Sequence, residues 1–189
     1  MAAWFRFWRE RASWLLFVAA VVAQSAFSLV FLNGEGSAWE KALAAGGGRL
    51  PEEQPGLVAI EPQRSIDAIQ ANSGVADYVL WQLIDIPYAV LNVIVITAAI
   101  ALLLRKAGLQ GSILRLALWL PLAYFAAECV ENAMVAAFAL DALAPNGTPA
   151  IVQQAATTIK LATGFGGMGL GLAAVVGAAI ADIVRRIRR

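Results

Sequence analysis

The sequence predicts an all-α membrane protein: a bundle of four transmembrane helices with both termini in the cytoplasm. Hydrophobic residues make up 60% of the 189 residues, and the mean hydropathy is +0.71, whereas soluble domains are roughly 45–50% apolar. The apolar residues form four runs long enough to cross a bilayer. The basic residues cluster on one side of those runs. We therefore expect residues 1–189 to form a single membrane domain.

The first predicted span covers residues 13–32. Arg6, Arg9 and Arg11 precede it, as basic residues precede the apolar core of a cleaved signal peptide. That core is only about 7–15 residues long, and the run here continues well beyond it. We therefore expect an uncleaved transmembrane helix.

An outer loop of about 44 residues, 33–76, follows the first span and is rich in glycine, proline and charge. Ser37 and Glu40 have the spacing of a capping box, with Gly46 as a helix stop. Ser65 is expected to cap a second short helix over 66–72, with Gly74 as its stop. Such short helices are unstable alone, so we expect them to lie on the membrane surface or over the ends of the spans.

The remaining spans are expected over residues 79–104, 116–140 and 159–180. The second and third are joined by the short basic segment 105–115, so they are antiparallel neighbours. The third and fourth are joined by 141–158, where Pro145, Asn146-Gly147 and Pro149 predict an irregular loop. We interpret Pro149 as a loop residue ahead of the fourth helix.

The distribution of Lys and Arg predicts the orientation. Ten of the 14 lie on the side of the termini and four on the other, and excess Lys and Arg mark cytoplasmic loops. The first group is Arg6, Arg9, Arg11, Arg105, Lys106, Arg115, Arg185, Arg186, Arg188 and Arg189; the second is Lys41, Arg49, Arg64 and Lys160. The arm at residues 4–9, WFRFWR, is expected to anchor the chain at the inner interface, or alternatively to lie on anionic lipid.

The composition excludes several classes of function. The chain has no histidine, which removes the commonest general base and metal ligand and the usual haem ligand. The single Cys129 cannot form an intramolecular disulfide and is expected to be a packing residue. No basic stripe with interleaved aromatic residues points to nucleic acid. We predict no catalytic, cofactor-binding or metal-binding residues.

Polar residues inside the apolar runs form the candidate site. An ionisable group costs at least ~2.5–3.5 kcal/mol near the bilayer centre, so it needs a partner or a function. The predicted intramembrane cluster contains Asp85, Tyr88, Asn92, Tyr124, Glu128, Glu131, Asn132 and Lys160. Folding the second and third spans about the middle of their connection places Glu128 level with Asn92 and Asn132 level with Tyr88. Asp85 then lies about one turn further out.

Prolines and glycines give the predicted bundle its irregular features. Pro87 in the second span and Pro121 in the third are each expected to remove a backbone hydrogen bond. Gly167 and Gly171 have the G-x-x-x-G spacing that lets helices approach closely. We expect Gly164, Gly167 and Gly171 to be packing residues that lie opposite the carboxylates of the third span.

Three functions are consistent with the polar cluster. In the favoured one, the chain is a non-catalytic membrane subunit or scaffold, Lys160 pairs with Glu131 or Asp85, and the other carboxyls stay protonated. In the second, the excess of carboxyls over lysine binds a cation, a proton or an amine in a transport-type protein. In the third, Glu128 and Asp85 act as acid and base in lipid-modifying chemistry, so enzyme activity is the least favoured reading.

Several short motifs resemble a pattern in uncharacterised bacterial four-span membrane proteins. They are Asp85-Ile-Pro87-Tyr88, Leu120-Pro121, Glu128-Cys-Val-Glu131-Asn132 and Thr158-Ile-Lys160. The resemblance covers the last three spans and implies an architecture but no activity.

The expected environment is the bacterial inner membrane, because the sequence is rich in Ala, Gly, Leu and Arg. Four helices enclose a thin interior, so a path through such a bundle requires more than one copy. We therefore expect the lipid bilayer and either a second copy or another membrane subunit as partners, and no nucleic acid.

Overall fold

A computed structural model describes residues 2–53 and 60–187, and every regular element over those residues is helical. Four helical segments are long and apolar enough to cross a membrane: Trp14–Leu32, Val75–Lys106, Ile113–Ala139 and Gly147–Val184. The prediction of a helical chain with four helices suited to crossing a membrane is thus confirmed for the described residues. The boundaries of the third and fourth helices differ from the predicted ones for reasons given below.

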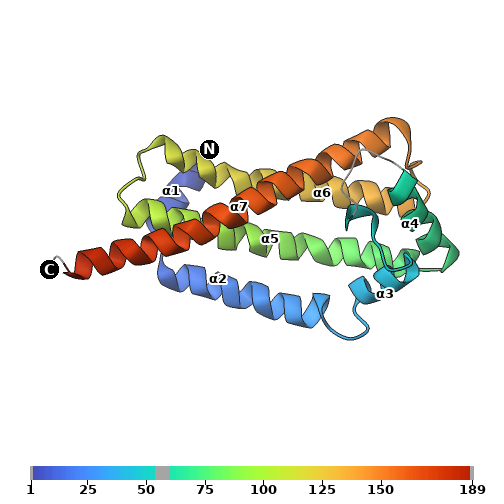
Figure 1. Cartoon of the computed structure of the whole chain (residues 1–189), viewed down its shortest axis with the longest axis horizontal. Coiled ribbons are helices and arrows are strands. Elements are labelled where there is room, and N and C mark those ends of the chain that lie inside the picture. Colours follow the sequence, from blue (N-terminus) through green and yellow to red (C-terminus); the bar gives the residue numbers. More distant parts are fainter. Residues whose placement is uncertain (1, 54–59, 188–189) are drawn as a thin grey trace.

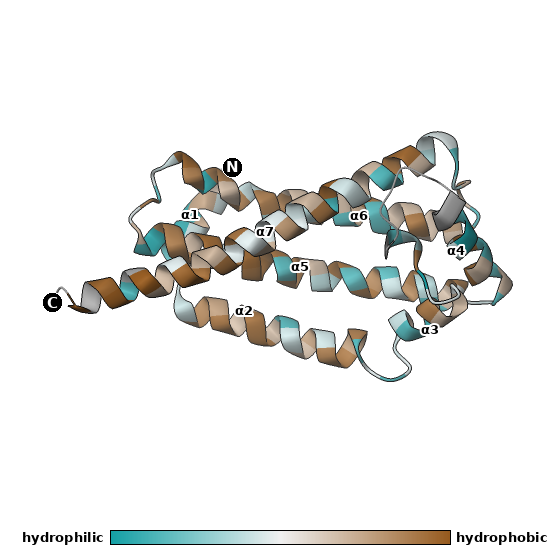
Figure 2. Cartoon of the chain, in the orientation of Figure 1, coloured by the Kyte–Doolittle hydropathy of each residue, from teal (hydrophilic) through white to brown (hydrophobic). Residues whose placement is uncertain are grey.

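Helix α5 (Val75–Lys106) is the centre of the bundle. It packs against α2 (Trp14–Phe27), α6 (Leu120–Ala139) and α7 (Gly147–Ile187), and α6 and α7 also pack against each other. Helix α2 continues as the π-helical turn η1 (Ser28–Leu32) and lies along one side of α5 (Figure 1). Hydrophobic residues dominate the long helices, whereas hydrophilic ones gather at α4 (Figure 2).

The two ends of the bundle differ in structure. Both termini lie toward one end, which we call the terminal end, and α3 (Ala38–Ala45) and α4 (Ile60–Ala71) lie at the other, the loop end (Figure 1). Leu50, Ile66, Ile69 and Tyr78 are buried together with residues of α6 in a core at the loop end. The short loop helices therefore lie over the ends of the long ones.

Helix α3 forms where the capping-box spacing predicts it. The Ser37 hydroxyl accepts a hydrogen bond from Glu40 N at 3.2 Å, and the Glu40 carboxylate accepts one from Gly36 N at 2.6 Å. The end of α3 then approaches the start of α5 so closely that a Cβ at Gly74 would lie 2.2 Å from Ala45 Cβ. Gly74 is therefore required by packing.

Helix α4 begins earlier than predicted. It starts at Ile60, so Ser65 lies within it and is buried rather than capping a helix over 66–72. Pro62 lies in the first turn of α4, where its missing N–H costs no hydrogen bond. A proline in this position does not stop a helix, so α4 begins ahead of the predicted start at residue 66.

Helix α1 (Ala2–Arg11) occupies the terminal end. Trp8 and Ala12 are buried against the last turns of α5 and against Leu118. The Trp4 indole N–H donates to Leu118 O at 3.3 Å, and Arg105 Nη1 donates to Ala12 O at 2.6 Å. The arm at residues 4–9 is thus folded onto the bundle, so the protein itself fixes where its basic side chains lie.

The third span begins as the 3₁₀ helix η3 (Ile113–Trp119), and this shifts its register against α5. A 3₁₀ helix rises about 2.0 Å per residue and an α-helix 1.5 Å, so seven residues of η3 add about 3.5 Å. Asn132 consequently contacts Asp85 and Gln82, not Tyr88 as predicted. Pro121 falls in the first turn of α6, directly after η3, and Pro87 lies inside α5.

Helix α7 starts at Gly147, twelve residues before the predicted span. Pro149 was interpreted as a loop residue but lies in the first turn of α7, where proline is tolerated. Only residues 140–146 connect α6 to α7. The hairpin therefore turns several residues earlier than predicted, and Gln153 and Thr157 lie on α7 as buried polar residues.

Candidate functional site

A cleft of about 510 Å³ lies between α5, α6 and α7, beneath the segment that joins α3 to α4. Its lining combines carboxyl groups, aromatic rings and aliphatic side chains. The lining residues are Leu50, Glu52, Trp81, Asp85, Tyr88, Tyr124, Glu128, Lys160, Leu161, Gly164, Phe165 and Met168. Five of the eight residues in the predicted polar cluster are among them. The other three, Asn92, Glu131 and Asn132, are buried behind the lining.

Lys160 of α7 is held by two carboxylates of α6. Its Nζ pairs with Glu131 and lies 3.4 Å from Glu128 Oε1. Glu131 is wholly buried and also accepts a hydrogen bond from the Thr157 hydroxyl. Gln153 Nε2 donates to that hydroxyl at 2.8 Å. Because each member has a partner, this half of the cluster is a closed network that joins α6 to α7.

Asp85 forms the open half of the cluster together with Glu128. Asn132 Nδ2 lies 3.3 Å from Asp85 Oδ2 and from Gln82 O, so this amide connects α6 to α5. Asp85 and Glu128 are close enough to interact directly. Both carboxyls line the cleft.

Tyr124 and Asn92 extend the polar surface toward the middle of the bundle. The Tyr124 side chain interacts with both Asn92 and Glu128. Asn92 in turn accepts a hydrogen bond from Gln24 of α2. Asn92 therefore lies near Glu128, and α2 reaches the cluster through this hydrogen bond and through Phe27, whose ring stacks on Tyr88.

Glu52 is a carboxyl of this site that the sequence reasoning missed. It accepts hydrogen bonds from Tyr78 Oη at 2.7 Å, Trp81 Nε1 at 3.0 Å and Gln82 Nε2 at 2.9 Å. The three donors are spaced i, i+3 and i+4 and so share one face of α5. That row of donors at the start of an apolar span was the available signal, since buried donors require an acceptor.

The charges of the site are unequal. Glu52, Asp85 and Glu128 line the cleft, and the only cationic side chain in the lining is Lys160, which is already paired with Glu131. Among the residues described, no group of three or more Cys, Asp or Glu side chains is placed to hold a metal ion. The carboxyl groups of the cleft are therefore spread over its lining and do not form a coordination shell for a metal ion.

The rest of the lining is aromatic and apolar. Trp81, Tyr88 and Tyr124 lie beside the carboxyls, and Phe165 and Met168 of α7 are 69% and 51% exposed. Aromatic faces attract cations within about 6 Å of the ring centre. A ligand that enters between these side chains meets an apolar surface first and the carboxyls behind it.

The glycines of α7 lie elsewhere than predicted. A Cβ at Gly164 would meet the Tyr124 ring at 3.2 Å, so Gly164 borders the cleft. Gly167 and Gly171 face Ile96 and Ala99 of α5 instead of the carboxylates. The early turn between α6 and α7 accounts for this shift. The G-x-x-x-G spacing is used for packing inside the chain.

Comparison with known protein families, with curated proteins and with solved structures finds no match to this chain. The resemblance to four-span bacterial membrane proteins therefore has no support beyond the motifs that suggested it. The geometry of the cleft is therefore the basis for assigning a function to this chain.

Proposed function

We propose that this chain binds a lipophilic organic cation, such as a hydrophobic amine, within the membrane. The observation that carries the proposal is the pairing of Asp85 and Glu128 at the inner wall of a cleft whose outer wall is aromatic and apolar. A cationic head would lie against the two carboxyls, and its apolar body would contact Trp81 and Phe165. This is the second of the three functions expected from the sequence, with a ligand class added.

Three features favour an organic cation over other ligands. An anion would be repelled by the three carboxyls in the lining. A metal ion prefers a compact set of oxygen, nitrogen or sulfur ligands, and the described residues offer no such set. The volume of about 510 Å³ falls in the range of small-molecule sites. An arylalkyl ammonium or quaternary ammonium ion satisfies both the negative charge and the aromatic, apolar walls of the cleft.

The closed half of the cluster has a structural role in this proposal. Glu131, Thr157 and Gln153 fix the position of Lys160. Glu131 balances the charge of Lys160. Glu128, the second carboxylate of α6, is therefore the excess carboxyl group at the cleft. The favoured sequence hypothesis of a structural polar cluster thus applies to this half, while the cleft half supports binding.

The proposed setting is a bacterial inner membrane with both termini in the cytoplasm. The cleft then lies in the non-cytoplasmic half of the bilayer, beneath α3 and α4, where a membrane-dissolved amine can reach it. Movement of the ligand across the membrane would need a second copy or another subunit, because four helices leave only a thin interior. These points extend the proposal, and labelling of exposed positions at the two ends of the bundle tests the orientation.

The test compares two probes of the same shape. Benzyltrimethylammonium and its neutral carbon isostere neopentylbenzene are titrated against the full-length protein in a neutral detergent, and the melting temperature is followed. We expect the cation to raise the melting temperature and the isostere to leave it unchanged. Asp85→Asn and Glu128→Gln should each weaken cation binding about tenfold or more, a loss of ~1.4 kcal/mol per factor of ten.

Asp77→Asn is the matched control, because Asp77 lies on the same helix outside the cleft and is partly exposed. It should bind the cation as the unchanged protein does. Equal stabilisation by the two probes, or undiminished cation binding in both carboxyl variants, would overturn the proposal.

A further inference from the structure

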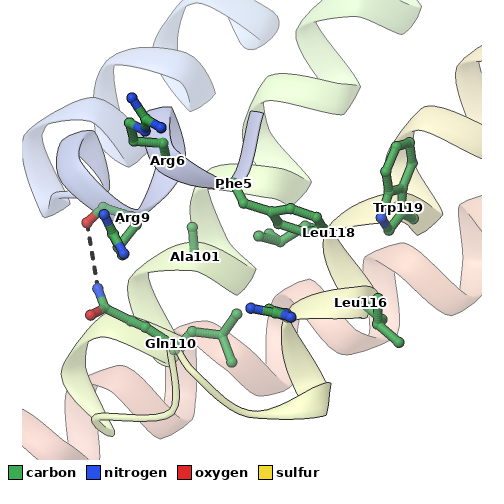
Figure 3. Close-up of a pocket in the computed structure, with 10 residues that line it drawn as sticks. Phe5, Arg6, Arg9, Ala101, Gln110, Leu116, Leu118 and Trp119 are labelled. Atoms are coloured by element: carbon green, nitrogen blue, oxygen red, sulfur yellow. Dashed lines mark hydrogen bonds between the residues drawn. The ribbon is translucent and has the colours of Figure 1, made fainter. Parts of the chain in front are cut away.

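A second pocket, of about 460 Å³, lies at the terminal end between α1, the end of α5 and η3. Arg6 and Arg9 of α1 form one wall, and Leu116 and Trp119 of η3 form the facing one (Figure 3). Arg115, at the start of η3, supplies a third guanidinium. The pocket is far from the acidic cleft and has the opposite charge.

The charge of this pocket is not neutralised from within. Its lining holds three arginines and no acidic residue. Arg9 has only a long ion pair with Glu10, at 3.9 Å between two half-exposed side chains. Within residues 2–53 and 60–187, Arg6 and Arg115 form no ion pair. Guanidinium groups match the geometry of phosphate oxygens, so the walls are suited to a phosphate.

Contacts within the protein position Arg115 and the backbone of Arg9. Arg115 lies over the Phe5 ring at 5.9 Å, and Phe5 packs edge-on against Trp119 with ring centres 5.9 Å apart. Gln110 Nε2 donates to Arg9 O at 3.4 Å, which joins the end of α1 to the turn after α5 (Figure 3). The pocket is therefore assembled from three elements and is more than a row of charges on a flexible arm.

We propose that this pocket binds the phosphate of an anionic phospholipid. Two observations favour a lipid over a soluble anion. Leu116 beside the arginines is 51% exposed, and the neighbouring Ile113 and Leu114 are exposed as well, so acyl chains have an apolar surface to follow from the pocket. The pocket also lies where the third apolar span begins, at the level of lipid headgroups. This inference is independent of the amine site.

The test uses the full-length protein in a neutral detergent. Dioleoylphosphatidylglycerol, dioleoylphosphatidylcholine and free glycerol 3-phosphate are titrated separately, and the melting temperature is followed. We expect phosphatidylglycerol alone to raise it, by a few degrees at saturation. Arg6→Gln and Arg115→Gln should each weaken this response about fivefold, since one basic side chain near an anionic surface contributes about that factor. Arg6→Lys should retain part of it.

Arg11→Gln is the matched control, because Arg11 lies on the same helix but outside the pocket lining. It should respond as the unchanged protein does. An equal response to both phospholipids, or one that the Gln variants keep, would overturn the proposal. A response to glycerol 3-phosphate as strong as to the lipid would instead assign the pocket to a soluble anion. Should a variant fail to fold, quenching of the unchanged protein's tryptophans by phosphatidylglycerol with brominated chains, but not by its phosphatidylcholine counterpart, decides the same question.

Discussion

Lys160 and Glu131 show how a charged pair is accommodated at the depth of the spans. Glu131 is inaccessible to solvent, and the Lys160 side chain is 14% exposed. Removing two charges from water is costly, and their attraction offsets this cost only when the remaining hydrogen bonds are made. The Thr157 hydroxyl donates such a bond to Glu131, and Gln153 in turn donates to that hydroxyl. The pair therefore fixes how α6 and α7 meet, whatever its net contribution to stability.

Breaking this pair on one side should be more harmful than removing it. Glu131→Gln leaves the ammonium group of Lys160 with only the more distant Glu128, so we expect a loss of about 3 kcal/mol in the free energy of unfolding. Adding Lys160→Met should recover part of that loss, because the buried ammonium group that lost its close partner is then removed as well. Unfolding by a denaturing detergent in mixed micelles, followed by circular dichroism, measures both variants.

Glu10→Gln serves as the control, since Glu10 is exposed and its pair with Arg9 is long. Its effect should stay within about 0.5 kcal/mol. Additive losses in the double variant would show that Lys160 and Glu131 are not coupled.

The residues found and missed differ in where their partners lie. Asp85, Glu128 and Lys160 could be chosen from the sequence because a charge within an apolar run is costly by itself. Glu52 could not, because a carboxyl in a polar loop is ordinary until three donors from α5 surround it. Which residues pair across the loop end depends on how the loop packs on α5, and the local sequence pattern does not encode that packing.

At the scale of elements, α7 shows that one helix uses its two glycine-bearing faces differently. Gly167 and Gly171 lie against Ile96 and Ala99 of α5. Gly166 and Gly169 have no neighbour within 4 Å of a built Cβ, and apolar side chains such as Leu172 surround them on the exposed face. Only the first face is needed to hold the chain together.

Leucine substitutions should distinguish the two faces. In Gly167→Leu the new Cβ lies 3.5 Å from Ile96, and the rest of the side chain must displace α5, so we expect a loss of ~1–3 kcal/mol. Gly169→Leu meets open space and gains helix propensity, so stability should be unchanged or slightly higher. Thermal unfolding of the purified chain measures both. Equal losses would show that the exposed face is also covered, as the prediction of a partner subunit requires.

Element boundaries explain most of what the sequence could not place. The existence of four long helices follows from the apolar runs alone, but their relative depth depends on the form of the connections. Seven residues of 3₁₀ helix in η3 move Asn132 by nearly one turn, from Tyr88 to Asp85. The early start of α7 moves Lys160 level with Glu128 and Glu131. Neither change alters hydropathy, so neither has a signature in the apolar pattern.

At the scale of the whole molecule, the two ends have opposite chemistry. Helix α7 has 41 residues, or about 61 Å at 1.5 Å per residue, roughly twice the ~30 Å hydrocarbon thickness. It therefore reaches from the loop end, where Glu52 and the other cleft carboxyls gather, past Asp182, which pairs with Lys106 at the terminal end. The acidic and the basic pocket lie at different depths along the same bundle.

The basic terminal end is the proposed cytoplasmic face, because eight of the 12 Lys and Arg residues in the described part of the chain belong to it. Two matched cysteine variants test this in a Cys129→Ser background: Ala142→Cys between α6 and α7, and Ala107→Cys just after α5. Both alanines are exposed and lie at opposite ends of the bundle. A membrane-impermeant maleimide applied to intact spheroplasts should label Ala142→Cys at once and Ala107→Cys only after permeabilisation. The reverse pattern would invert the orientation and place the amine cleft in the cytoplasmic half, whereas immediate labelling of both would rule out a bundle that separates its two ends.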